Sequence, residues 1–264
     1  IYEGRSLDDG GVRKELLTIL TQHFISIGII QKCGKNDSLV WFNPDFDINK
    51  LEGELPSILT DVNIYFVVGL VIGLAVHNSV LINFPLPSSV YKLMAGSKLD
   101  LSDLWNADED LARGVQGVLD IEEGIGSLGE LLGVTHVASK NPLLDSKVDI
   151  KDAERRDQYL YVDLIPDGSK QLVERGNRAR FVDLFLNHVL YKSVKSCIDE
   201  FLRGLKFLMR SSIYDNCTNQ ELDLLINGDT ELGDLSVLRI YTEYKGEYHD
   251  EHPVIQWFWN TLSS

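Results

Sequence analysis

The stretch of sequence that best defines the fold is Ile64-Tyr65-Phe66-Val67-Val68-Gly69-Leu70-Val71-Ile72-Gly73-Leu74-Ala75-Val76-His77-Asn78. Its apolar part, from Ile64 to Val76, has 13 residues, whereas a helix needs about 20 apolar residues to cross a bilayer. Apolar side chains fall on all sides of the predicted helix, so we expect burial on all sides, with His77 as a hydrogen-bonded core residue. The stretch therefore predicts a core helix and not a membrane span.

The chain is strongly acidic. Its 264 residues include 25 Lys and Arg against 40 Asp and Glu, which gives a formal net charge of −15. With 44% apolar and 9% aromatic residues, the composition is that of a globular protein with a real core, which excludes wholesale disorder. A domain that binds a nucleic-acid backbone needs a basic surface. The charge therefore argues against nucleic acid as the main partner and favours basic protein surfaces.

Helical spacing of apolar residues dominates the sequence. Thr218-Asn219-Gln220-Glu221 matches a capping box, and the helix that follows is expected to stop at Gly228. The longest periodic segment, Phe181 to Leu208, predicts one continuous helix of about 40 Å. The last helix is rich in aromatic residues and is expected to pack into the core. The predicted helices contain residues 16–27, 64–78, 90–95, 111–121, 181–208, 219–227 and 254–259.

Two segments have the pattern of strands. Leu39 to Phe42 is a short β-like run closed by Asn43-Pro44, and Tyr159 to Leu164 precedes a turn at Pro166-Asp167-Gly168. The second strand belongs to a region with its own charge, because residues 99–163 contain 15 Asp and Glu against 6 Lys and Arg. We interpret this region as a separate subdomain. The fold class is therefore α+β and mainly helical.

Motifs for cofactor or metal chemistry are weak. Gly124-Ile125-Gly126-Ser127-Leu128-Gly129 matches GxGxxG, but charged residues precede it and no strand-helix series follows, so we interpret it as a flexible loop. A dinucleotide-dependent enzyme stays an alternative that saturable binding of NAD would support. His249-Asp250-Glu251-His252 offers four metal ligands in a row, but they cannot all converge on one ion, so an exposed turn is expected. We predict no cofactor and no metal.

The three cysteines have no catalytic setting. Their odd number and the absence of a CxxC pair argue against a disulfide framework and a zinc site. Cys197 lies on or beside the apolar face of a helix, Cys217 precedes a helix without a His partner, and Cys33 is expected in a polar loop. The start of the chain, Ile1 to Arg5, lacks the features of a signal peptide. We expect an intracellular protein, cytoplasmic or nuclear, that is part of a longer polypeptide.

Several segments, in this order, resemble the HECT family of ubiquitin ligases. The first residues, Asp8 to Glu15, are similar to an opening Asp-x-Gly-Gly-x-x-Lys/Arg-Glu motif, and Trp41-Phe42-Asn43-Pro44 to a following Phe-Asn-Pro motif. Val68 to Asn78 resembles a Gly-x-x-x-Gly-x-Ala-x-x-Asn helix. The remaining matches are Leu190 to Val194, Phe201 to Gly204, Leu222 to Gly228, Thr242 to Tyr248 and Phe258-Trp259. Two departures are the long stretch Gly124–Asp157 and Glu247, where many members have glycine.

The resemblance implies the N-lobe of a HECT domain, with a large helical subdomain and a small α/β insert that docks a ubiquitin-conjugating enzyme. On the family pattern, residues 1–98 and 196–264 form the large subdomain and residues 99–195 the small one. The acceptor cysteine lies in a following C-lobe, which this chain lacks, so the chain alone should be inactive. The residues that the family pattern assigns to the docking groove are Leu111, Val115, Val118 and Ile121 on one wall and Phe181 and Phe185 on the other.

The implied function is a transferase of the ubiquitin conjugation pathway. Such a ligase passes ubiquitin by transthiolation to its own cysteine and then to a substrate lysine, with substrates held by regions outside this chain. The acidic insert would attract the basic surface of a conjugating enzyme, with solubility as the alternative role of the charge. Two alternatives stay open: the groove residues are ordinary core, or the chain is a non-catalytic binding module or scaffold. Neither nucleic acid nor a membrane is an expected partner.

Overall fold

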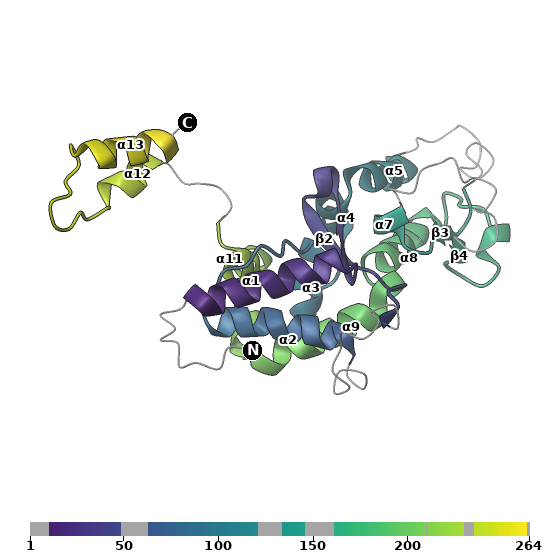
Figure 1. The fold of residues 1–264 in the computed structure, drawn as a ribbon. Coiled ribbons are helices and arrows are strands. Elements are labelled where there is room, and N and C mark those ends of the chain that lie inside the picture. Colours follow the sequence, from purple (N-terminus) through teal and green to yellow (C-terminus); the bar gives the residue numbers. More distant parts are fainter. Residues whose placement is uncertain are drawn as a thin grey trace. The chain divides into compact units, whose positions relative to one another are not determined.

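The computed structural model describes residues 11–48, 63–120, 134–145, 161–209, 211–229 and 235–262 (Figure 1). Helices dominate, and the strands form two antiparallel pairs, so the mainly helical α+β class is confirmed. The chain divides into two compact units, Ile1–Asn227 and Gly228–Ser264. None of the helices in the described ranges has both the length and the apolar character needed to cross a membrane.

The first unit contains most of the secondary structure. Its strands pair β1 with β2 and β3 with β4, with the registers Ile30↔Phe42 and Val137↔Asp163. The strands are β1 (Ile30–Cys33), β2 (Leu39–Phe42), β3 (Val137–Ser139) and β4 (Tyr161–Asp163). The helices are α1 (Gly11–Ser26), α2 (Ile64–His77), α3 (Ser88–Met94), α4 (Leu101–Ala107), α5 (Glu109–Asp120), α7 (Pro142–Asp145), α8 (Arg178–Leu190), α9 (Lys195–Leu208), α10 (Ser211–Asn216) and α11 (Asn219–Asn227).

Helices α2 and α9 form the centre of the core. Two glycines let their backbones approach closely, because neither has a side chain at the crossing. A methyl group added at Gly69 would lie 2.8 Å from the Leu205 nitrogen and closer still to the Phe201 carbonyl oxygen. Reciprocally, a methyl group at Gly204 would lie 2.9 Å from the Leu70 nitrogen. The Phe201 ring also contacts Phe42 of β2 edge to face, with the ring centres 5.2 Å apart.

Three asparagines connect segments that are distant in sequence. The side-chain amide of Asn43 donates to the Gly28 carbonyl at 2.8 Å, and the Tyr65 hydroxyl donates to the carbonyl oxygen of Asn43. Asn78 ends α2 by donating to the Leu74 carbonyl at 2.7 Å, and its oxygen accepts from Arg13 of α1 at 3.0 Å. Asn227, at the end of α11, accepts from the Phe84 amide at 2.7 Å. Each asparagine therefore anchors a chain segment to the core.

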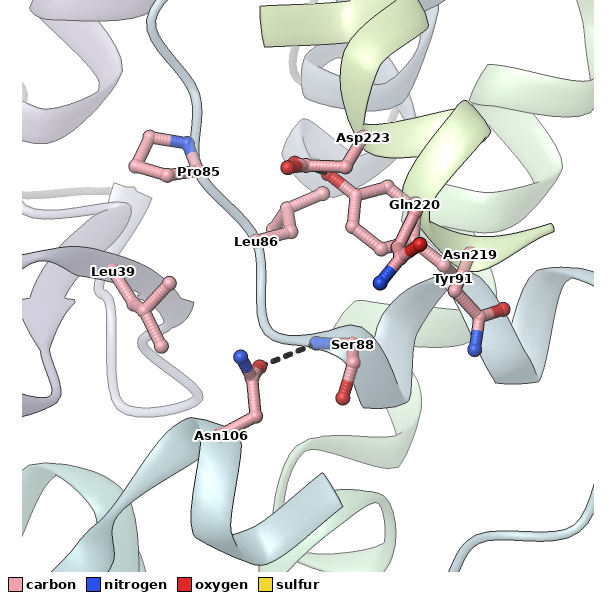
Figure 2. Close-up of a pocket in the computed structure, with 9 residues that line it drawn as sticks. All are labelled: Leu39, Pro85, Leu86, Ser88, Tyr91, Asn106, Asn219, Gln220 and Asp223. Atoms are coloured by element: carbon pink, nitrogen blue, oxygen red, sulfur yellow. Dashed lines mark hydrogen bonds between the residues drawn. The ribbon is translucent and has the colours of Figure 1, made fainter. Parts of the chain in front are cut away.

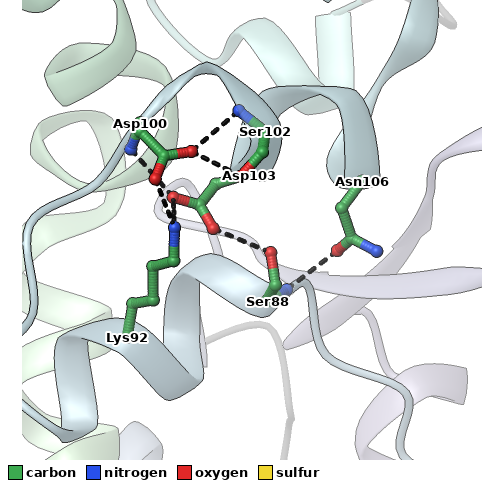
Figure 3. A network of polar contacts seen from close by, with 6 residues as sticks. All are labelled: Ser88, Lys92, Asp100, Ser102, Asp103 and Asn106. Atoms are coloured by element: carbon green, nitrogen blue, oxygen red, sulfur yellow. Dashed lines mark hydrogen bonds and ion pairs between the residues drawn. The ribbon is translucent and has the colours of Figure 1, made fainter. Parts of the chain in front are cut away.

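A polar network joins α3 to α4. The Ser88 amide at the start of α3 donates to the Asn106 side chain at 2.8 Å (Figure 2). The Lys92 ammonium contacts Asp100 at 2.7 Å and the fully buried Asp103 at 2.8 Å (Figure 3). Asp100 also caps α4 by accepting from the Ser102 amide at 2.8 Å. Hydrogen bonds from Lys92 and Ser102 lower the pKa of Asp100 to about 2.

The structure corrects four expectations about the first unit. Helix α2 is not buried on all sides, because Leu74 is 40% exposed, and His77 is exposed at its end and not a core residue. The predicted helix over 181–208 is broken into α8 and α9 by a 3₁₀ turn at Lys192–Val194. A 3₁₀ helix has three residues per turn and an α-helix has about 3.6. The two values are so close that the spacing of apolar residues does not reveal the break. Cys33 is fully buried in β1 and does not lie in a polar loop.

Other predicted details are confirmed. Thr218 and Glu221 form the expected capping box, since the Thr218 amide donates to Glu221 at 2.7 Å and the Glu221 amide donates to the Thr218 hydroxyl at 3.2 Å. Gly228 follows α11 with a positive φ of 76°. The turn at Pro166-Asp167-Gly168 is present, with the Gly168 amide donating to Ile165 at 2.9 Å. Residues 8–10, 124–129 and 159–160 lie outside the described residues.

The second unit contains α12 (Leu235–Ile240) and α13 (Pro253–Leu262). The Arg239 guanidinium binds the Asp250 carboxylate through two hydrogen bonds, at 2.8 and 3.0 Å. Trp259 of α13 is buried and donates to the Tyr244 hydroxyl at 2.9 Å. Its neighbours Trp257 and Phe258 are 67% and 53% exposed. The predicted aromatic helix is therefore present. Trp259 is buried as expected, whereas Trp257 and Phe258 are exposed and do not pack into a core.

The α2–α9 contact predicts the effect of an added methyl group. Gly69→Ala should destabilise the chain by about 1–3 kcal/mol or more, because the helices must separate to make room. Gly114→Ala is the matched control on α5, where nothing lies within 4 Å of the added carbon, and it should stabilise by up to about 1 kcal/mol. Urea unfolding measures both. A Gly69→Ala variant as stable as the parent would contradict the close approach.

The Asp100 contacts predict a loss of stability in acid. Since the folded-state pKa lies below that of the unfolded chain, the contribution of Asp100 is complete above about pH 4 and disappears between about pH 4 and 2. Asp100→Asn keeps a good helix cap but removes the charge. The variant should show a shallower decline of unfolding free energy over this pH range. An unchanged slope would mean that the Lys92–Asp100 pair contributes nothing to stability.

Candidate docking surface

The predicted docking residues lie on α5 and α8, which pack directly against each other. Helix α5 begins where Asp108 accepts hydrogen bonds from the amides of Asp110 and Leu111, both at 3.0 Å. Leu111, Val115 and Val118 then follow at spacings of four and three residues and share one face. On α8, Phe181 and Phe185 are one turn apart, with ring centres 5.8 Å apart. The structure therefore places both predicted walls in the same region of the first unit.

Burial divides these residues into two groups. Val115 and Phe181 are only 5% and 4% exposed, so in this conformation they are core residues that support the surface from beneath. Leu111, Val118 and Phe185 are half-buried and keep part of their side chains at the surface. Ile121 lies outside the described residues. The core interpretation thus describes Val115 and Phe181, while the other three keep apolar area at the surface.

Two histidines complete the region, and sequence reasoning did not identify them. The His136 ring stands edge-on to Phe181, with centres 5.6 Å apart, and its Nδ1 pairs with the Gln171 carbonyl at 2.9 Å. His188 of α8 pairs with the Ser139 carbonyl of β3 at 2.8 Å, and burial lowers its pKa. His188 follows Phe185 by three residues, so helical spacing could have placed it on the same face of α8. Nothing in the sequence singles out His136.

Acidic side chains border the half-buried Leu111. Together with Gly34 and Leu111, the charged residues Lys35, Asp108, Glu109, Asp110 and Arg113 line a cleft of about 520 Å³. These lining residues form two ion pairs, Lys35 with Glu109 at 3.3 Å and Arg113 with Asp110, one turn apart on α5, at 2.8 Å. All four side chains are largely exposed, so these pairs are weak and open to competition from solvent or a partner. Three carboxylates against two cations leave the cleft negative.

Contacts between the β3–β4 segment and the rest of the unit hold this region in place. Asp45, after β2, accepts from Lys140 at 2.8 Å and from Asn141 at 2.9 Å. The turn after β4 is tied to the residue before β3 by the His136 amide, which donates to the Gly168 carbonyl at 3.0 Å. A methyl group at Gly168 would clash with the His136 carbonyl, so the turn requires glycine at this position. The small sheet is thereby fixed beside α8.

Two of the three cysteines are buried core residues and do not have the setting of a nucleophile. Cys33 and Cys197 are buried, and burial raises the pKa of the Cys197 thiol, which disfavours the thiolate. Cys217 is half-buried. Within the described ranges, no group of three or more His, Cys, Asp or Glu side chains is placed to hold a metal ion. The His249–His252 segment forms the expected exposed turn, where His252 accepts from the Val254 amide at 3.2 Å.

Comparison with known proteins gives a consistent result. A family model described as HECT-domain (ubiquitin-transferase) matches residues 16–264. The probable E3 ubiquitin-protein ligase HUL4 of Eremothecium gossypii is 27% identical over 97% of this chain and 29% of its own length. The probable E3 ubiquitin-protein ligase HERC4 of Homo sapiens is 26% identical over 97% of this chain and 22% of its own length. The E3 ubiquitin-protein ligase RSP5 of Saccharomyces cerevisiae is 26% identical over 97% of this chain and 28% of its own length.

The chain therefore spans less than a third of the length of these relatives. The family match, in contrast, covers nearly the whole chain, from α1 to its last residue. It includes the glycines of the α2–α9 contact and the three anchoring asparagines. On this match, the chain belongs to the HECT-domain family of ubiquitin transferases.

Proposed function

We propose that this chain recruits a ubiquitin-conjugating enzyme for a HECT-type ligase. Ubiquitin then passes by transthiolation to a cysteine outside this chain and from there to a lysine of a substrate. The family match over residues 16–264 carries this proposal. The contribution of the chain is proximity, because it holds the donor thioester near the acceptor thiol.

The surface that we assign to docking combines apolar area with negative charge. Leu111, Val118 and Phe185 supply the exposed apolar contacts, with Ile121 assigned by the resemblance alone. Val115 and Phe181 support them from the core, and removal of either would deform the surface. Burying an apolar side chain of this size gains about 1.5–3 kcal/mol. This is enough for Phe185 to act as an interface hot spot.

The acidic cleft beside Leu111 supports the assignment on electrostatic grounds. A basic surface of a conjugating enzyme would be attracted to Asp108, Glu109 and Asp110 before contact. Such attraction raises the association rate more than the final affinity, and it weakens as salt is added. The exposed pairs with Lys35 and Arg113 can exchange for contacts with the partner at little cost.

The docking proposal predicts the effect of truncating Phe185. Phe185→Ala should weaken binding of a conjugating enzyme by about 1–2 kcal/mol, about a five- to thirty-fold loss of affinity, with the cooperative unfolding transition retained. Val12→Ala is the control, because Val12 is 53% exposed on α1, and it should leave affinity unchanged. Calorimetric titration against a panel of conjugating enzymes measures both variants.

The buried neighbour of Phe185 distinguishes a surface role from a core role. Phe181→Ala should lower the unfolding free energy by about 3–5 kcal/mol because it leaves a cavity beside His136. Equal affinities of the parent and Phe185→Ala for an enzyme that binds the parent would refute the assigned surface. A stable Phe181→Ala variant with weakened affinity would move the direct contact to Phe181.

The setting of the cysteines predicts that this chain alone accepts no ubiquitin. With activating enzyme, a conjugating enzyme that binds the chain, ubiquitin and ATP, none of the three thiols should form a reductant-sensitive adduct. Non-reducing electrophoresis measures this, with the charged conjugating enzyme as the positive control. An adduct that disappears in Cys217→Ser would contradict the proposal, since Cys217 is the least buried of the three.

A further inference from the structure

A second cavity lies away from the α5–α8 surface. It opens between β2, α3, the end of α4 and the first turn of α11 (Figure 2). Leu39, Pro85 and Leu86 form its apolar wall, and the carboxamides of Asn106 and Gln220 face them with the Asp223 carboxylate. The volume is about 180 Å³, below the range of about 300–1,000 Å³ typical of sites for cofactors and drug-sized ligands. It therefore suits a single long side chain.

Hydrogen bonds from backbone amides hold the walls of this cavity in place. The Pro85 carbonyl accepts from the Val40 amide of β2 at 2.9 Å. One residue earlier, the Phe84 amide donates to Asn227 of α11 at 2.7 Å. On the opposite side, Asn106 accepts from the Ser88 amide at 2.8 Å. Because three elements are tied to the same short segment, the cavity exists before any ligand enters, and binding costs little reorganisation.

The polar side of the cavity is suited to a cation. Asp223 uses one oxygen, Oδ1, to accept from Tyr91 and from Asn227, each at 2.8 Å. Among the described residues, its other oxygen and the Gln220 carboxamide have no hydrogen-bond partner. No basic side chain from the described part of the chain lines the cavity. The basic residue of α3, Lys92, is engaged by Asp100 and Asp103.

The start of α11 does not reverse this preference. A helix N-terminus carries about half a positive charge, whereas the Asp223 carboxylate carries a full negative one. Glu221 adds a second carboxylate at this end of the helix, where it accepts from the Thr218 amide at 2.7 Å. The chain as a whole has a formal charge of −15. The local and the overall field therefore both favour a positively charged ligand.

We propose that this cavity binds a lysine or arginine side chain of a protein partner. The methylene groups of that side chain would lie along Leu39, Pro85 and Leu86. Its charged end would donate to the free oxygen of Asp223 and to the oxygen of Gln220. The site uses residues other than the α5–α8 docking surface, so it is independent of the function proposed above.

The test uses small probes that present one side chain as a protein does. The probes are the Nα-acetyl methylamides of arginine, lysine and norleucine, titrated into the isotopically labelled chain. The amide signals of Asn106 and Gln220 should move saturably with the two cationic probes and not with norleucine. Added salt should weaken the effect. Equal shifts with norleucine, or no shifts at all, would overturn the proposal.

Variants distinguish binding in the cavity from nonspecific attraction of the cationic probes to an acidic chain. Asp223→Asn should weaken binding at least about tenfold while its side-chain oxygen still accepts from Tyr91, and Gln220→Glu should strengthen it. Asp215→Asn, at an exposed position of α10, removes the same charge elsewhere and should have no effect. Equal weakening by Asp215→Asn and Asp223→Asn would reduce the effect to nonspecific attraction. Binding of arginine amide with a free α-amine, but not of the blocked probe, would refute the side-chain assignment.

Discussion

The close approach of α2 and α9 is the constraint on which the rest of the first unit depends. Gly69 and Gly204 each face the backbone of the opposite helix, so the two helices touch without intervening side chains. Around this contact, Phe42 packs on Phe201 and connects the β1–β2 pair to the helices. A larger residue at either glycine would push the helices apart and open the core between them. The two glycines therefore set the distances at which all neighbouring elements pack.

The anchoring asparagines lie in three of the short motifs by which the chain resembles the HECT family. The side chains of Asn43 and Asn227 each pair with a backbone group of another segment. The Asn78 side chain pairs with a carbonyl of its own helix and with the Arg13 side chain of α1. An aliphatic residue at Asn43 or Asn227 would leave a part-buried backbone group unpaired, which costs up to about 1–3 kcal/mol for each group. Apolar core positions, in contrast, tolerate exchange among residues of similar volume. The motifs thus mark places where chemistry, and not only size, is required.

Much of the fold was predictable from sequence because its signals are local. The core helix, the capping box at Thr218 and the turn at Gly168 depend on residues a few positions apart. The errors concern properties that depend on distant residues. The break near Tyr191 preserves the apolar spacing, and the burial of Cys33 results from strand pairing and packing that its polar neighbours do not indicate. The division of the chain at residues 98 and 195 stays a prediction.

The candidate site is also only partly predictable from sequence, because burial there depends on packing between distant residues. Helical spacing places Val115 and Phe181 on the apolar faces of α5 and α8, but it cannot say which part of a face is covered by the neighbouring helix. Packing of α5 on α8 buries these two and leaves Leu111, Val118 and Phe185 half-exposed. A docking surface formed from the edge of a packed interface has a physical advantage. Its apolar side chains are already ordered by the core, so a partner gains their contacts with little further loss of side-chain entropy.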